Sequence, residues 1–216
     1  IPDLRHRPAT TMTSSTPTLA QAPDSLPPHA ATGGAPPGDL AVWVFIFAEL
    51  LAFGVFFAAY AFTRMRHVEL FDTMQLTLDR HAGALNTFLL ITSSWCVARA
   101  VHAVEHTRNG AATRWLAGAL ACGGGFLIVK GIEYADKFGA GISLSTNTFY
   151  MFYLSLTFFH FMHVILGMVV LAILAVQTRR GDYRPGHMNG LESGAAYWHM
   201  VDLVWIVLFP LVYVMR

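Results

Sequence analysis

Long apolar runs alternate with short charged stretches along the chain after its first 38 residues. Few polar side chains interrupt these runs. We predict a helix for each run, at about residues 40–62, 84–103, 115–134, 149–178 and 193–215. A helix needs about 20 apolar residues to cross a membrane, and four of the runs reach this length outright. The third does so if Lys130 lies within the span and its amine extends to the membrane surface.

The composition agrees with a membrane location. Hydrophobic residues make up 55% of the chain and charged residues only 12%, against roughly 25% charged in soluble domains. A soluble fold is therefore excluded, and we expect an all-α integral membrane protein built as a bundle of five transmembrane helices. The net charge of +1 gives no reason to expect a nucleic-acid partner. Cys96 and Cys122 fall inside predicted spans, where packing is expected rather than a disulfide.

The first 38 residues differ in kind from the transmembrane domain of residues 39–216. They contain most of the ten prolines, with alanine, threonine and serine between them, and we expect a disordered tail. We expect the natural start at Met12 or Ile1. A slight excess of arginine near residues 179–184 favours a cytoplasmic N-terminus and a periplasmic C-terminus.

Glu49 lies about midway along the first predicted span. One interpretation is a carboxyl group that is protonated and hydrogen-bonded to a neighbouring helix, because an apolar environment disfavours the charged form. The other is a proton relay, since an ionisable residue within a membrane helix is by default a functional candidate. The residue alone does not decide between them.

Further polar residues lie in the last two spans. Glu192, His199 and Asp202 fall within about 80° of one another on a helix, and His160 and His163 lie one turn apart. Interhelical hydrogen bonding is the favoured interpretation. A haem or metal site built from His160, His163 and His199 is the alternative. In the third span, Glu133 follows Lys130 by three residues, and we expect an ion pair at the membrane interface.

The order and content of these segments closely resemble subunit III of the haem–copper oxidase superfamily. Five stretches carry the resemblance, one from each span: FIFAELLAF (45–53), LNTFLLITSS (85–94), KGIEY (130–134), FFHFMHVILG (158–167) and YWHMVDLVW (197–205). Within the family, the chain looks most like the NorE-type branch associated with nitric oxide reductases. The stretches at residues 69–71, 83–87 and 93–95 carry that narrower resemblance.

The resemblance implies a non-catalytic respiratory subunit or accessory protein in a bacterial inner membrane. Such a subunit packs beside the catalytic subunit I of a haem–copper oxidase or nitric oxide reductase and supports its assembly, stability and proton uptake. The partner holds the haem and the copper or non-haem iron, while this chain binds no metal or redox cofactor of its own. Membrane phospholipid is the ligand that the resemblance implies for this chain.

The resemblance also assigns roles to individual residues. Glu49 matches the family's intramembrane acid, and Trp198 and Trp205 are candidate contacts for lipid. A structural polar network is expected from eight residues: Asn86, Glu133, His160, His163, Glu192, Tyr197, His199 and Asp202.

Two departures from the family pattern are evident. The chain has five spans where the long form has seven, so a lipid cleft built from the missing pair must be absent or completed by a partner. Phe161 stands where many members have glycine.

Two other functions are weighed against a subunit role. One is an independent haem or metal enzyme using His160, His163 and His199. The other is a proton-coupled transporter using Glu49, for which repeats and broken helices are expected.

Overall fold

The protein is represented by a computed structural model that describes residues 39–215. Its long helices are α1 (Leu40–Arg66), α3 (Arg80–Glu105), α4 (Asn109–Gly139), α5 (Thr148–Arg180) and α6 (Asn189–Phe209). A short helix α2 (Val68–Gln75) joins α1 to α3, and a π-helical segment η1 (Pro210–Val214) extends α6. The prediction of an all-α membrane protein with five spans is confirmed for the described residues. The predicted disordered tail lies outside them.

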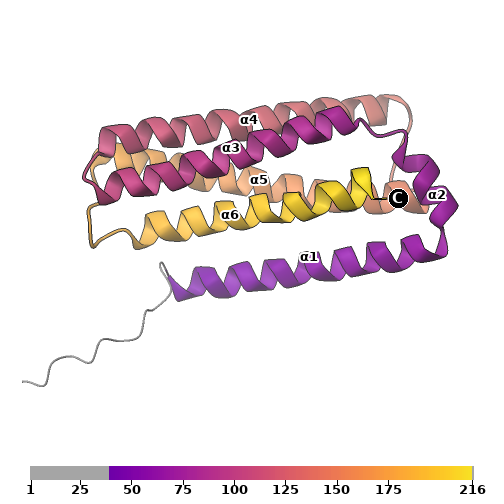
Figure 1. Cartoon of the computed structure of the whole chain (residues 1–216), viewed down its shortest axis with the longest axis horizontal. Helices are drawn as coiled ribbons and strands as arrows, with labels where there is room; N and C mark the ends of the chain where they lie inside the picture. The colour runs from indigo at the N-terminus through magenta and orange to yellow at the C-terminus, as the bar shows by residue number, and fades with distance from the viewer. Residues whose placement is uncertain (1–38, 216) are drawn as a thin grey trace, which may run out of the picture. The chain divides into compact units, whose positions relative to one another are not determined.

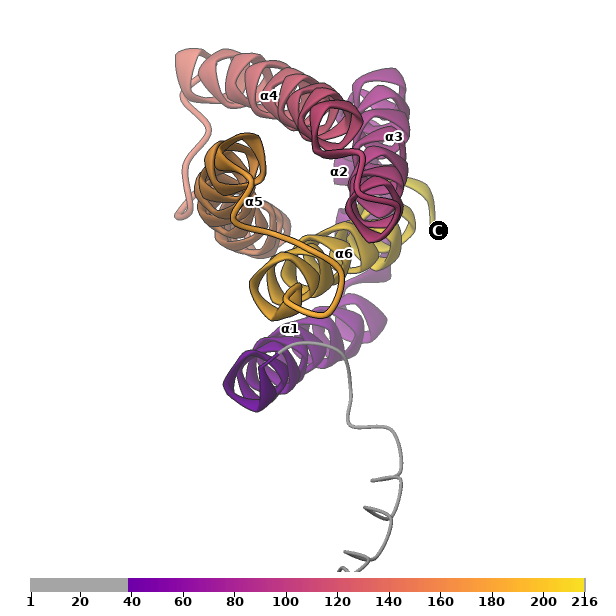
Figure 2. The ribbon, with the colours of Figure 1, turned by 90° about the vertical axis from the view of Figure 1, so that its left-hand side faces the viewer.

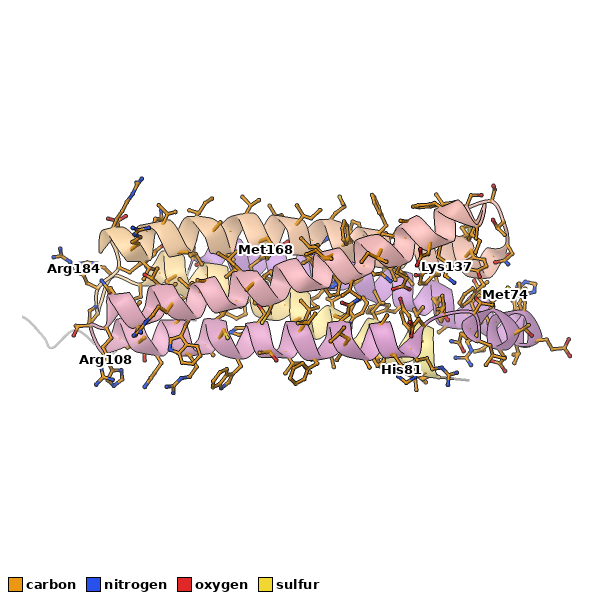
Figure 3. The ribbon with its side chains drawn as sticks, turned by 90° about the horizontal axis from the view of Figure 1, so that it is seen from above. Met74, His81, Arg108, Lys137, Met168 and Arg184 are labelled. Carbon is orange, nitrogen blue, oxygen red and sulfur yellow. The ribbon has the colours of Figure 1, made fainter. Side chains whose placement is uncertain are left out.

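Four helices form a closed bundle, and α1 lies outside it. Each of α3, α4, α5 and α6 contacts its neighbours on both sides, so that α6 closes the ring against α3 (Figure 2). Successive helices run in opposite directions, which is the up-and-down topology that short connections favour. The fifth long helix, α1, packs mainly on α6 (Figure 1). Arg108 and Arg184 mark one end of the bundle, and His81 and Lys137 the other (Figure 3).

Side-chain caps explain why several helices begin where they do. The carboxylate of Asp79 accepts hydrogen bonds from the backbone N–H groups of His81 and Ala82, at 2.8 and 3.1 Å. This starts α3 four residues before the apolar run that predicted it. Asn147 caps α5 in the same way, accepting from the N–H of Tyr150 at 2.8 Å. Such caps satisfy N–H groups that have no partner within the helix.

Helix α1 is the least buried of the five spans. Only 11% of the residues in its most apolar segment are buried, against 56% for α6. Its buried residues, Ile46, Phe53 and Tyr60, form one narrow stripe. The remaining faces expose large apolar side chains, namely Leu40, Val44, Phe45, Phe47, Leu51, Val55, Phe56, Phe62 and Met65. In a membrane these faces contact lipid or another protein.

The short helix α2 packs between the end of α1 and the η1 segment at the C-terminus of α6. Phe71 is fully buried, and its ring lies 5.3 Å from that of Tyr60. The amide of Gln75, also fully buried, donates to the carbonyl oxygen of Val212 at 3.1 Å. Val212 belongs to η1, which begins at Pro210, a residue without an N–H to continue the α-helical pattern. Helix α2 therefore fixes η1 and α1 together.

Candidate functional site

Glu49 on α1 and His163 on α5 form a hydrogen-bonded pair between two spans. The Oε2 atom of Glu49 lies 2.9 Å from the Nε2 atom of His163. Their side chains are 19% and 10% exposed, respectively. Glu49 lies nine residues into α1, about 14 Å along the helix axis from its start, so the pair lies at membrane depth. The structure therefore gives the acid predicted from the sequence a definite partner.

The second ring nitrogen of His163 restricts what the pair can do. Its Nδ1 atom lies 2.7 Å from the carbonyl oxygen of Phe159, which can only accept a hydrogen bond. Nδ1 therefore carries a hydrogen, and a neutral imidazole has its lone pair on Nε2, facing Glu49. The Nε2–Oε2 hydrogen bond then needs a single hydrogen, carried by one group or the other. With the proton on Glu49 the pair is neutral, and with the proton on His163 it is an ion pair.

Aromatic rings enclose this pair on the side of the bundle. Phe53, which is 1% exposed, lies with its ring 5.3 Å from the imidazole of His163. The ring of Phe159 lies 4.6 Å from the same imidazole. From α6, the hydroxyl of Tyr197 donates to the carbonyl oxygen of His163 at 3.4 Å. Aromatic side chains thus cover the pair on the side that faces the bundle, while Glu49 stays partly exposed.

A second polar cluster surrounds Lys130, and it corrects the sequence interpretation. The amine is fully buried and donates to Oε2 of Glu133 at 3.1 Å. It also donates to the hydroxyl of Tyr213 at 2.5 Å and lies 3.3 Å from that of Tyr153. Both hydroxyls donate to Oε1 of Glu133, at 2.7 and 2.5 Å. The predicted ion pair exists, but the expected snorkelling of Lys130 is wrong, because its amine faces the bundle interior.

The predicted polar network is not continuous in the described residues. Glu133 belongs to the Lys130 cluster and His163 pairs with Glu49, while Nδ1 of His199 lies 2.5 Å from the Ser94 hydroxyl on α3. On α6, Asp202 also hydrogen-bonds Ser94, so His199 and Asp202 share this partner, with one carboxyl oxygen of Asp202 left unpartnered. Glu192, which is half-buried, stands apart from them. Asn86 and His160 are fully buried, and both polar side-chain atoms of each are unpartnered.

Trp198 and Trp205 are not lipid contacts, and that prediction is wrong. Their side chains are 1% and 0% exposed. Trp198 fits beside two glycines, and a Cβ on Gly167 would lie 2.7 Å from its ring. The indole N–H of Trp205 donates to the hydroxyl of Thr87 at 3.0 Å inside the bundle. Glycines on neighbouring helices make room for the rings, so the aromatic residues pack inward.

A groove of about 610 Å³ opens between α1, α3 and α6. Its walls are mostly apolar, with Trp43 and Leu50 on α1 and Val101 on α3. Glu105 and Glu192 also line it. The groove therefore combines an apolar trough with acidic groups, a form suited to an extended apolar molecule with a polar head.

The three histidines of the alternative metal hypothesis do not assemble a site. His163 is engaged with Glu49 and His199 with Ser94, while His160 lies among aromatic rings. Among the described residues, three potential metal ligands lie close together elsewhere, at His102, Glu105 and His106. The transporter alternative expects a helix broken at mid-membrane, whereas the described spans are continuous up to Pro210 near the end of α6.

The sequence interpretation missed Tyr153 and Tyr213 as partners of Glu133. Tyr213 lies 80 residues from Glu133 along the chain, so only the folded bundle brings the two together. The sequence did contain one signal for such partners. Lys130 and Glu133 lie three residues apart in an apolar span, and the next charged residue is Asp136. A charged pair within a span indicates that additional polar groups face it.

Together, the described residues form an all-α integral membrane protein of five spans with ionisable side chains buried between its helices. Residues 37–216 match the protein family described as cytochrome c oxidase subunit III. The chain belongs to this family, within the haem–copper oxidases. It is an integral membrane protein of the subunit III type, and bacterial relatives place it in the plasma membrane.

Individual relatives support the family assignment. A cytochrome c oxidase subunit 3 from Thermostichus vulcanus is 34% identical over 181 residues, covering 82% of this chain and 86% of the relative. A heme-copper oxidase subunit I+III from Aeropyrum pernix is 32% identical over 179 residues, covering 80% of this chain and 22% of the relative. A probable cytochrome c oxidase subunit 3 from Rickettsia conorii is 34% identical, covering 79% and 65% respectively. The chain thus spans less than two thirds of two of these relatives.

Proposed function

We propose that this chain is a non-catalytic subunit that packs beside the catalytic subunit of a respiratory haem–copper oxidase or nitric oxide reductase. The Aeropyrum pernix relative is named as a joined subunit I+III, which supports close association of two such units. The apolar faces of α1, exposed on all sides but one stripe, offer the surface for this association. The haem and metal centres belong to the partner, and this chain supplies assembly and stability.

We also propose a role in proton uptake. The hydrogen bond between Glu49 and His163 is the observation that supports it. The two side chains meet across one hydrogen bond between the weakly covered helix α1 and α5. A carboxyl–imidazole pair exchanges a proton over a single hydrogen bond of 2.9 Å. With α1 against the catalytic subunit, the pair buffers a proton beside the partner's uptake route. Turnover of the complex then stays coupled to proton delivery.

The test is reconstitution of the catalytic subunit in liposomes, with the wild-type chain, with Glu49→Gln, or without the chain. Glutamine can donate its amide hydrogen to His163 but cannot exchange a proton. We expect Glu49→Gln to bind the partner like the wild-type chain and to lower proton uptake per electron. Equal proton uptake with both forms would remove the proton role. Failure of the wild-type chain to bind would remove the subunit role, and failure of Glu49→Gln alone would show that the carboxyl group is structural and would count against the proton role.

The terminal electron acceptor of the complex is either oxygen or nitric oxide. We propose a partner of the nitric oxide reductase type, on the basis of three sequence stretches at residues 69–71, 83–87 and 93–95. Nitric oxide consumption and oxygen consumption by the purified complex distinguish the two acceptors. Oxygen consumption alone would contradict this assignment and leave the subunit role intact.

A phospholipid in the groove between α1, α3 and α6 is proposed as the ligand of this chain. The apolar trough suits an acyl chain, and the exposed carboxylate of Glu105 suits a headgroup that carries an amine. The variant Ala196→Trp fills the groove and is expected to lower the amount of co-purified phospholipid. An unchanged lipid content would contradict the assignment.

A cytoplasmic N-terminus and a periplasmic C-terminus are proposed for the orientation. Arg108, Arg179, Arg180 and Arg184 then lie at the cytoplasmic end, as the distribution of positive charge favours. Cysteine labelling by a membrane-impermeant reagent at Gly186→Cys and Gly141→Cys tests it, because these loop residues lie at opposite ends of the bundle.

A further inference from the structure

The last turn of α3 carries three potential metal ligands on one side of the helix. His102, Glu105 and His106 each offer one ligand atom, and these atoms lie within 4.8 Å of one another. The Nδ1 atom of His102 is 3.4 Å from Oε2 of Glu105. Neighbouring ligands around a tetrahedral zinc ion are separated by roughly 3.3 Å, given bonds of about 2.0–2.1 Å. All three residues are exposed, so an ion in solution has access to them.

The hydrogen bonding of His106 prepares one of its nitrogens for a metal. Its Nδ1 atom lies 2.9 Å from the carbonyl oxygen of His102. Because a carbonyl only accepts, Nδ1 carries the hydrogen and the lone pair of the neutral ring is on Nε2. Metal-binding histidines usually donate their second ring N–H to a carbonyl or carboxylate in this way, which fixes the tautomer and the ring orientation.

The backbone after these ligands is held in a definite conformation. The N–H of Arg108 donates to the carbonyl oxygen of Ala103 at 2.8 Å, closing the end of the helix. Thr107 has a φ of 57°, a left-handed conformation that is unfavourable for a β-branched residue and needs such bonds to hold it. His106 is the C-terminal cap of α3, where the helix dipole favours positive charge. The helix dipole therefore favours a cation at this position.

We propose that His102, Glu105 and His106 bind one divalent ion of the zinc class. Two imidazoles and a carboxylate are donors suited to zinc, copper or nickel rather than to magnesium or calcium. Three protein ligands leave the fourth position of a tetrahedral ion for water or another group. Glu105 also lines the groove between α1, α3 and α6, so the bound ion lies at the edge of this groove. This site is separate from Glu49 and His163, but it shares Glu105 with the proposed phospholipid groove, where a zinc ion and a headgroup amine would compete for that carboxylate.

The test measures zinc binding to the full chain in detergent, freed of metal and of any affinity tag. Zinc chloride competes with a chromophoric chelator to give the affinity, and cobalt(II) replaces zinc to report the ligand geometry in its visible spectrum. The variants are His102→Ala, His106→Ala and Glu105→Gln. His81→Ala, an exposed histidine at the opposite end of α3, is the matched control.

We expect one zinc ion per chain and a tetrahedral cobalt spectrum. Each of the two ligand histidine variants should weaken zinc binding at least tenfold, and Glu105→Gln should weaken it to a smaller extent. His81→Ala should bind zinc like the wild-type chain. The proposal is overturned if the wild-type chain takes up no zinc, or if the double variant His102→Ala/His106→Ala binds it with unchanged affinity.

Discussion

The carboxyl group of Glu49 meets the imidazole of His163 at 2.9 Å, across the boundary between α1 and the four-helix bundle. Since α1 buries only a narrow stripe, this is one of the few polar connections that hold it to α5. The same bond therefore has two possible consequences, one for the stability of the helix arrangement and one for the location of a proton. Conservative substitutions separate them.

Glu49→Gln is expected to unfold at nearly the wild-type temperature, because its amide still donates to Nε2 of His163. Glu49→Ala leaves that nitrogen without its partner and should cost about 1–3 kcal/mol. Thermal unfolding of both variants in the same detergent provides the measurement. If Gln destabilises the chain as much as Ala does, the carboxyl group has a structural role that an amide cannot fill.

Lys130→Met is expected to destabilise the bundle by about 3–5 kcal/mol, the usual cost of leaving a buried charge without its partner. The uncompensated group is Glu133, which still accepts from the hydroxyls of Tyr153 and Tyr213. Chemical denaturation, followed by the loss of helical signal, gives the free energy of unfolding.

The control for this substitution is Lys137→Met on the same helix. Lys137 makes one exposed hydrogen bond, to the carbonyl oxygen of Thr77, and its loss should cost less than about 1 kcal/mol. The double variant Lys130→Met/Glu133→Gln should recover part of the stability, because the buried charge is gone. No recovery would show that the amine acts through packing and not through its ion pair.

Gly167→Ala is expected to cost about 1–3 kcal/mol through overpacking. The new methyl group would lie 2.7 Å from the rigid ring of Trp198, which is buried and has little room to move. Gly124→Ala is the matched control, since nothing lies within 4 Å of a Cβ there. That change should be neutral or stabilising, by up to about 1 kcal/mol, as for alanine in an ordinary helix. Equal unfolding temperatures for the two variants would contradict the close approach.

His199→Ala is expected to cost about 1–2 kcal/mol, in the range of interhelical hydrogen bonds in membranes. Its Nδ1 atom and the hydroxyl of Ser94 connect α6 with α3. Ser94→Ala removes the other side of the same bond. The two changes together should therefore cost less than the sum of their separate costs. Strict additivity in this double-mutant cycle would show that the two side chains do not interact.

The sequence was sufficient to predict the spans because membrane helices are recognisable from length and hydropathy alone. Helix α2 was missed because its burial depends on distant partners. Phe71 contacts Tyr60 and Phe149, and Gln75 bonds to Val212, 137 residues further along the chain. Eight residues with two charges gave no apolar run to detect.

The polar residues show the same limit. Glu49 was recognisable as an acid within a span, but its partner His163 lies 114 residues away in sequence. The direction that Lys130 faces could not be predicted, because α4 is apolar on several sides and the sequence does not say which side meets lipid. The inward packing of Trp198 likewise depends on glycines of two other helices, Gly123 and Gly167.

Purification from native membranes in a mild detergent tests whether this chain is a subunit of a respiratory complex. The complex is captured through this chain, its haem spectrum is recorded, and the co-purifying proteins are identified by mass spectrometry. We expect a haem-containing catalytic subunit of the haem–copper oxidase superfamily in a fixed ratio to this chain, with the haem absent when the chain is purified alone. A chain that purifies without any catalytic subunit, while the membrane's oxidase and nitric oxide reductase complexes are complete without it, would contradict the account.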